Sequence, residues 1–299
     1  MCPTRALAAR AGASVLAALA LFPIGAGVNS AAEGALTIDV QSRRARPGEV
    51  LVVTVTTPQP VTGVSIAAFS ASWPAWRQTD TTWRALVGID LDQRPGPYTL
   101  TATASGTGSP SATYALSVAR HAFPRRTLSV APDYVNPPAE VLARINIEAE
   151  LLTQAYAHSD RAPGWGSGFR RPVQETANSS FGTRSVFNGQ PRSPHGGTDF
   201  LSPAGTEVHA PAEGRIAVAR DLFFTGNTVV IDHGLGVFSM LAHLSRVDVR
   251  EGDRIGTGDL VGLVGATGRV TGPHLHWALR VGAARVDPLS ALEVLPVSR

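Results

Sequence analysis

The chain has 299 residues, of which 43% are hydrophobic and 16% charged; this composition excludes a disordered protein, and the length suits two folded domains. All 26 basic residues are arginine, and 23 acidic residues reduce the net charge to +3. Because the arginines form no cluster, no nucleic-acid partner is expected.

The N-terminal end has the pattern of a secretory signal peptide. Two arginines precede an apolar stretch at about residues 11–24, and the small residues Ser30 and Ala32 follow at the spacing that signal peptidase recognises. Residues 1–32 are therefore predicted to be a cleaved signal peptide. The protein is expected to be exported, to the periplasm or to the extracellular side of the cell envelope.

An uncleaved membrane anchor is the alternative for the same stretch. The stretch contains Gly12 and Pro23 and falls short of the roughly 20 residues that a membrane-spanning helix needs, so cleavage is favoured. Cys2 is the only cysteine and would leave with the signal. Metal ligands in the mature chain must then come from His and carboxylate side chains.

Residues 33–120 have the pattern of an immunoglobulin-like β-sandwich. Short segments alternate apolar with small or polar residues, and Pro- and Gly-containing turns separate them. Six or seven strands are expected, of which six are located at residues 35–40, 49–57, 63–71, 82–91, 98–105 and 112–118. Trp73, Trp76 and Trp83 also lie here, and they form either a ligand-binding patch or, as we expect, part of the packing.

Residues 121–168 are predicted to be a linker with a helix at about residues 138–158. Pro138 suits the first turn of a helix, because its missing N–H needs no partner there. One face of the helix is apolar, and a Gly-rich stretch follows it. The apolar positions are Val141, Ile145, Ala149, Leu152 and Tyr156. We expect this helix to act as a strut between domains, without a chemical role.

Residues 169–299 are predicted to form a Gly-rich domain of short antiparallel strands. Glycine stands at nearly every corner between the strands, and little helix is expected. This pattern indicates a barrel-like or sandwich core. The predicted fold class is therefore mainly β along the whole chain.

The last domain contains two motifs that can supply metal ligands. In HGGTD, His195 and Asp199 stand four residues apart across two glycines, whose flexibility lets the backbone turn both side chains toward one centre. In HLH, His274 and His276 share one face of a strand while Leu275 points into the core. Together the motifs offer the nitrogen and oxygen ligands that Zn²⁺ takes, but spacing alone leaves open which histidines bind it.

The order of motifs resembles the lysostaphin/LytM-type zinc endopeptidases, which hydrolyse peptide bonds in bacterial peptidoglycan. The resemblance covers roughly residues 170–290. It is carried by HGGTDF, EVHAPAEGRI, VVIDHGLG, LAHLS, GDRIGTGDLVGLVGATG, TGPHLHWALR and the final Asp287-Pro288. The upstream domain resembles, more loosely, the β domain that often precedes such peptidases.

This resemblance implies a zinc ion bound by His195, Asp199 and His276, with His243 and His274 as unligated catalytic histidines. One of these two would be the general base, and the other would stabilise the oxyanion. His274 is the stronger candidate for the base, because it shares a strand face with His276. The implied substrate is peptidoglycan peptide, and a regulatory partner in the cell envelope is kept open.

The remaining histidines receive no catalytic role. His233, in the IDHG segment, is expected to be structural or to support a ligand. His209 is expected to pack or to line a pocket. His121 and His158 lie outside the last domain and have no evident partners in the sequence.

Three other functions fit parts of the sequence. An inactive relative that binds the wall or activates another hydrolase would be expected to lose ligands, and none is missing. A lipoyl- or biotin-carrier domain would share the Gly-rich segment at residues 252–265 but needs an attachment lysine, which the chain lacks. Carbohydrate binding applies to the front domain alone. A zinc endopeptidase acting on peptidoglycan is the expected function.

Overall fold

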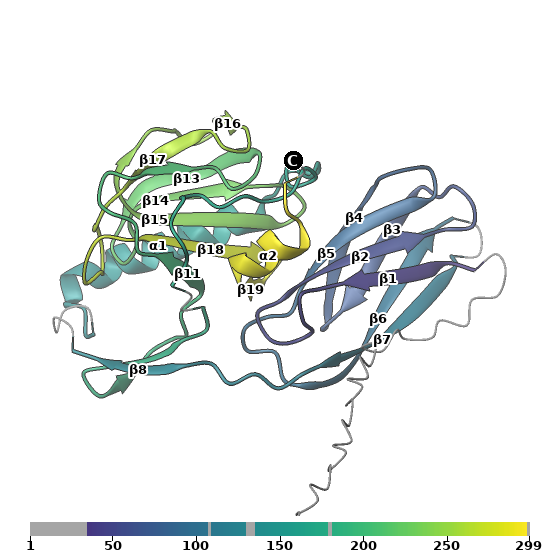
Figure 1. Cartoon of the computed structure of the whole chain (residues 1–299), viewed down its shortest axis with the longest axis horizontal. Coiled ribbons are helices and arrows are strands. Elements are labelled where there is room, and N and C mark those ends of the chain that lie inside the picture. Colours follow the sequence, from purple (N-terminus) through teal and green to yellow (C-terminus); the bar gives the residue numbers. More distant parts are fainter. Residues whose placement is uncertain (1–34, 107–108, 130–134, 179–180, 298–299) are drawn as a thin grey trace, which may run out of the picture.

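The computed structural model describes residues 35–106, 109–129, 135–178 and 181–297. It shows two β-rich parts that lie side by side, a front half at residues 35–118 and a rear half at residues 125–297 (Figure 1). The predicted mainly β fold is confirmed. The predicted signal peptide lies outside the described residues. Within the described part, no helix has the length and apolar character needed to cross a membrane.

The front half is a single antiparallel sheet with the order β1-β2-β5-β4-β3-β6-β7. Its strands are β1 (Thr37–Gln41), β2 (Val50–Thr56), β3 (Gly63–Ala68), β4 (Ala71–Arg77), β5 (Thr82–Gly88), β6 (Gly96–Ser105) and β7 (Ser111–Val118). The outer strands β1 and β7 contact each other, so the sheet curls around its own apolar face. The immunoglobulin-like assignment stays a prediction.

Strand β4 was not expected from the sequence. Pro74 lies within it, and proline lacks the N–H that a central strand donates to its neighbour. The structure places Pro74 where β4 changes partners: Ala71 to Pro74 pair with β3, and Ala75 to Arg77 pair with β5. The proline is tolerated because one ladder ends there and the other begins.

The three tryptophans of the front half serve packing, as expected. Trp73 and Trp83 are buried, and Trp73 Nε1 donates a hydrogen bond to the Ala68 carbonyl. Trp76 packs edge-on against Trp165 of the rear half, with the ring centroids 4.1 Å apart. The alternative of an exposed aromatic patch is therefore excluded for Trp73 and Trp83.

The rear half is built on a sheet with the order β11-β18-β15-β14-β13-β16, to which β12, β17 and β19 are added. Its strands are β11 (Gly197–Phe200), β12 (Glu207–His209), β13 (Gly214–Leu222), β14 (Gly226–Asp232), β15 (Val237–Val247), β16 (Arg254–Ile255), β17 (Leu260–Val264), β18 (Leu275–Val281) and β19 (Ala284–Val286), followed by helix α2 (Pro288–Val294). A small sheet of β8 (Arg125–Leu128), β9 (Arg184–Phe187) and β10 (Gln190–Pro191) flanks it.

Helix α1 (Ala139–Ala157) lies against the main sheet of the rear half (Figure 1). Leu152 and Tyr156 of its predicted apolar face pack on Val218, Val230 and Phe238. Ala149, also placed on that face, is exposed. The contact therefore depends on the C-terminal half of the helix.

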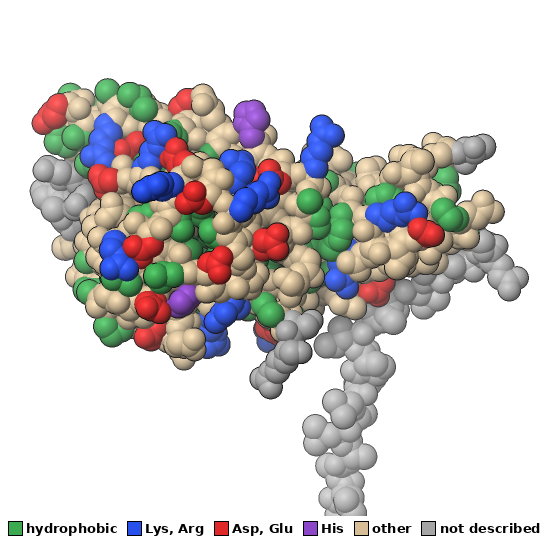
Figure 2. All heavy atoms as spheres, turned by 90° about the horizontal axis from the view of Figure 1, so that it is seen from above, with side chains coloured by type: hydrophobic (Ala, Val, Ile, Leu, Met, Phe, Trp, Pro, Cys, Tyr) green, Lys and Arg blue, Asp and Glu red, His purple; other side chains and the backbone are tan. Residues whose placement is uncertain are grey.

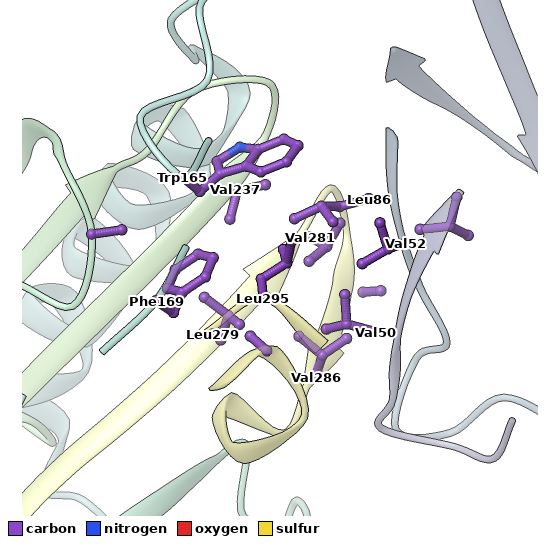
Figure 3. Close-up of a cluster of buried hydrophobic side chains, with 14 of the residues drawn as sticks. Val50, Val52, Leu86, Trp165, Phe169, Val237, Leu279, Val281, Val286 and Leu295 are labelled. Carbon is purple, nitrogen blue, oxygen red and sulfur yellow. The ribbon is translucent and has the colours of Figure 1, made fainter. Parts of the chain in front are cut away.

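The two halves share one hydrophobic core. Figure 3 shows Val50 and Val52 of β2 facing Val281 of β18 and Val286 of β19. Strand β2 is buried along nearly its whole length, because one of its faces packs in the front half and the other meets the rear half. On the face drawn in Figure 2, arginine and acidic side chains are interspersed, without a large patch of one sign.

An ion-pair network reinforces this junction. Glu49, whose side chain is 1% exposed, accepts hydrogen bonds from Arg43 at 2.9 and 3.0 Å and from Arg46 at 2.8 Å. Arg43 also donates to Asp287, which caps α2 in the rear half, at 2.7 Å. Burial alone would raise the pKa of Glu49, but hydrogen bonds from the two arginines hold it below its ordinary value.

Glu49→Gln is expected to lower the free energy of unfolding by about 2 kcal/mol, because Arg43 and Arg46 lose a buried, charged acceptor. The pKa of Glu49 is lower in the folded protein than in the unfolded chain. The carboxylate therefore stabilises the fold fully at pH values above its unfolded pKa, and this stabilisation is lost as the pH falls through its folded pKa. The gap between wild type and variant should therefore narrow below about pH 4. Urea unfolding followed by circular dichroism measures the difference in the free energy of unfolding and its dependence on pH.

Asp80→Asn is the matched control, since Asp80 pairs with Arg77 but its side chain is 81% exposed. Its effect should stay below about 0.5 kcal/mol. Equal effects of the two variants would contradict the role given to Glu49.

Candidate metal centre

Strands β11, β18 and β15 are neighbours, and their register aligns the residues of the two histidine motifs. Asp199 of β11 lies directly opposite His276 of β18, which in turn lies opposite Ala242 of β15. His195 comes just before β11, and its backbone N–H donates to the Thr183 carbonyl. Residues far apart in the sequence thus reach one face of the sheet.

Three side-chain atoms converge at this place. His195 Nε2 lies 2.9 Å from His276 Nδ1 and 3.2 Å from Asp199 Oδ1, and Asp199 Oδ1 lies 3.0 Å from His276 Nδ1. These three residues form a group that can hold a metal ion. The separations fit a shared cation, because two ligand atoms on a tetrahedral zinc ion lie about 3.3 Å apart. Three protein ligands also leave one position open, as in catalytic zinc sites.

Burial and charge keep two of these groups in the forms that bind metal. Burial alone would raise the pKa of Asp199, but hydrogen bonds and charge from His195 and His276 hold that pKa well below its ordinary value. Burial lowers the pKa of His276, and this effect outweighs the hydrogen bond to Asp199. The site presents a carboxylate and a neutral imidazole at neutral pH, the states that metal binding requires.

Gly197 allows close packing and does not serve a turn. A β-carbon on Gly197 would lie 2.6 Å from His276 Cε1 and 2.6 Å from the Trp277 carbonyl oxygen, closer than real side chains approach. A β-carbon on Gly196 would meet nothing within 4 Å. Neither glycine has a positive φ. The expectation of a backbone turn is therefore wrong for Gly197, which lies within β11, and stays a prediction for Gly196.

His243 lies at a β-bulge in β15. Its φ of 66° is in the left-handed region, and the register between β14 and β15 shifts beside it. Bulges of this kind redirect a side chain, and here the ring centroid lies 5.9 Å from that of His276. The ring Nδ1 is 2.9 Å from the Thr267 carbonyl, which can only accept, so Nδ1 carries the proton. Burial lowers the pKa of His243 to about 3, which leaves a neutral ring with Nε2 as an acceptor.

His274 lies beside these residues, just before β18 begins. Its Nδ1 is 2.9 Å from the Gly272 carbonyl and therefore donates, while its Nε2 is 3.9 Å from Asp199 Oδ1. The His243 and His274 ring centroids are 4.8 Å apart. Leu275 is fully buried, so the predicted alternation across HLH is confirmed. All five residues singled out in the sequence come together.

The other histidines of the rear half lie outside this centre. His233 is buried, with Nδ1 2.8 Å from the Glu213 carbonyl and Nε2 2.9 Å from Ser239 Oγ. Burial lowers its pKa to about 4. Its structural role is confirmed. His209 donates from Nδ1 to the Gly258 carbonyl at 3.0 Å.

A cavity of about 180 Å³ adjoins His276, and two of its lining residues, Met240 and Arg280, were not singled out in the sequence. Tyr156 of α1, Met240 of β15 and Arg280 of β18 line it. The helix expected to be only a strut thus contributes to its wall. The one signal for this cavity was the period of two along β18, which puts Arg280 on the same face as His276.

Comparison with known proteins matches residues 193–288 to the model of peptidase family M23. A crystal structure from Pseudomonas aeruginosa, described as a peptidase M23, is 32% identical with a TM-score of 0.65; the match covers 85% of this chain and 97% of that one.

Two curated relatives match a shorter part. Peptidoglycan DD-endopeptidase ShyA of Vibrio cholerae is 43% identical over 98 residues, which are 33% of this chain and 23% of that protein. DD-carboxypeptidase/endopeptidase Mpg of Neisseria meningitidis is 44% identical over 96 residues, 32% of this chain and 22% of that protein. The match thus spans less than a quarter of either relative's length.

Gly197→Ala is expected to weaken binding of a divalent metal by at least about tenfold, because the new methyl group displaces the His276 ring. Equilibrium dialysis followed by elemental analysis measures the affinity. Gly196→Ala is the matched control and should bind metal like the wild type. Equal affinities of the two variants would show that the close contact at Gly197 does not position His276.

Proposed function

The chain belongs to peptidase family M23, and on that premise we propose that it is a zinc-dependent endopeptidase that hydrolyses peptide bonds in bacterial peptidoglycan. The observation that carries the proposal is the convergence of His195 Nε2, Asp199 Oδ1 and His276 Nδ1 within 3.2 Å of one another. ShyA, which is named as a peptidoglycan DD-endopeptidase, supports the substrate class, and Mpg, which is named as a DD-carboxypeptidase/endopeptidase, supports the reaction.

His195, Asp199 and His276 are proposed to hold the zinc ion. Two nitrogen donors and one carboxylate oxygen suit zinc, and the described chain presents no thiolate to this site. When bound, the ion would supply Lewis-acid chemistry: it makes a water easier to ionise near neutral pH and polarises the scissile carbonyl.

His274 is proposed as the general base. Its Nε2 faces the centre, 3.9 Å from the Asp199 carboxylate, and its Nδ1 proton is committed to a backbone carbonyl. The ring can therefore accept the proton of the attacking water at Nε2 and release it to the leaving amine. The Gly272 carbonyl keeps the proton on Nδ1, so Nε2 is the nitrogen that gains and releases the transferred proton.

His243 is proposed to act as a second hydrogen-bond acceptor. An oxyanion donor at Nε2 would need the doubly protonated ring, because Nδ1–H already donates to Thr267. Burial opposes that charged form. This supports a role in orienting the water or the leaving amine, and it argues against the oxyanion role weighed from the sequence.

We also propose that the protein acts in the cell envelope, where its substrate lies. The sequence pattern at residues 1–32 supports export. Cell fractionation tests this, and recovery of the protein only from the cytoplasm would contradict it.

His276→Ala is expected to abolish both zinc binding and peptidoglycan hydrolysis, because it removes a ligand. His274→Ala and His243→Ala should keep zinc but lower kcat by at least about 100-fold, since only proton transfer or water positioning is lost. Zinc content by mass spectrometry and release of soluble muropeptides measure the two properties.

His209→Ala is the control histidine variant and should keep both properties. Chelation should inactivate the wild type, and added zinc should restore it. A wild-type protein that binds no zinc and leaves peptidoglycan intact would overturn the proposed function.

A further inference from the structure

The cavity beside the metal centre continues the same row of side chains along β18. Residues of this strand alternate between buried and partly exposed positions, so His276, Ala278 and Arg280 share the face that carries the metal ligands. Met240 lies opposite Ala278 on β15, and Phe238 lies opposite Arg280. His274 lies on the other side of His276. The metal centre therefore has the proton-transfer residue at one end and the cavity at the other.

The shape of the cavity suits a small substrate group. Ala278 and Gly196 leave room next to the His276 ring, whereas Tyr156, Phe238 and Met240 provide apolar walls. Tyr156 packs edge-on against Phe238, with the ring centroids 5.2 Å apart, which holds this wall in place. The volume of about 180 Å³ accommodates a few non-hydrogen atoms of a side chain or chain end.

The charge of the cavity is positive. Arg280 and Arg285 line it, and no acidic residue does so among those described. Arg285 is already paired with Asp90 and Asp92 of the front half, at 2.8 and 2.9 Å. The Arg280 guanidinium lies 4.6 Å from the centroid of the Tyr156 ring and is hydrogen-bonded to the Tyr156 side chain. Among the ion pairs of the described residues that involve this cavity, both belong to Arg285 and none to Arg280. Its guanidinium is the cation left for a ligand.

We propose that this cavity is a substrate subsite in which Arg280 binds a carboxylate near the scissile bond. The inference rests on the proposed peptidase function and adds a substrate preference to it. Guanidinium groups match carboxylates in shape and charge and bind them through paired hydrogen bonds. Arg280 lies four residues beyond His276 on β18. Four residues of a strand advance about 13 Å, so Arg280 is suited to a carboxylate about two to four residues from the bond that is cut.

A matched pair of substrates tests the subsite. One is a purified muropeptide dimer whose free carboxylates flank the cross-link, and the other is the same dimer with those carboxylates converted to carboxamides. The zinc-loaded wild type is expected to have a kcat/KM about 10- to 100-fold higher for the acid form, mainly through KM, as a charge-assisted hydrogen-bonded pair predicts.

Arg280→Met should remove this preference by raising KM for the acid form, with little effect on the carboxamide. Arg280→Lys should keep part of it, because the charge remains without the paired donors. Arg77→Met is the control, since it removes an arginine of the front half that does not line the cavity, and it should keep the full preference. Zinc content, measured for each variant, checks that the metal centre is intact.

The outcomes separate the two proposals. A wild type that cleaves both dimers equally, or an Arg280→Met variant that keeps the preference with zinc bound, would overturn the subsite and leave the peptidase function standing. A wild type that cleaves neither dimer would overturn the function. In that case, calorimetric binding of the two dimers decides the subsite: tighter binding of the acid form that is lost in Arg280→Met supports it, and equal binding refutes it.

Discussion

Antiparallel pairing between β11 and β18 places Asp199 opposite His276, and the rest of the centre depends on this register. A slip of one residue would turn His276 toward the core and bring Trp277 to the surface, because strand side chains alternate between faces. Gly197 lets the two strands lie close enough for His276 to meet its partners. His195 lies in the short segment just before β11, so its side chain reaches Asp199 and His276 as well.

The front half supports this arrangement through buried contacts. Arg43 binds Asp287, whose other carboxylate oxygen accepts a hydrogen bond from Thr198 at 3.1 Å. Thr198 is the residue before Asp199 on β11, with its side chain on the opposite face. Asp90 and Asp92 meanwhile hold Arg285 at the edge of the cavity. The front half therefore contacts Asp287, which holds Thr198 beside the metal centre, and Arg285, which lines the cavity.

The sequence predicted the mainly β fold, because period-two alternation is a local signal. The five centre residues were predicted through the resemblance to the LytM-type family, since spacing alone left open which histidines bind the metal. The sequence did not predict β4, since Pro74 hides a strand whose two ends pair with different neighbours. The local sequence suggested a turn at Gly197. The actual reason for this glycine, a close approach between two strands, depends on the partner strand and cannot be predicted from neighbouring residues. The bulge at His243 and the cavity wall from Tyr156 likewise arise from contacts between distant segments.

One face of β18 is buried and contributes to stability, and the other face carries the residues proposed for metal and substrate binding. On the buried face, Trp277 Nε1 donates to Ser239 Oγ at 3.0 Å, and that hydroxyl lies 2.9 Å from His233 Nε2. Because this Ser–His pair is fully enclosed, it stabilises the strand and cannot meet a substrate. On the open face, His276 faces the metal centre and Arg280 faces the cavity. The buried polar network behind the strand thus keeps the metal ligand His276 and the cation Arg280 at a constant spacing. An enzyme needs such a constant spacing to select a substrate by the distance between its charged group and the scissile bond.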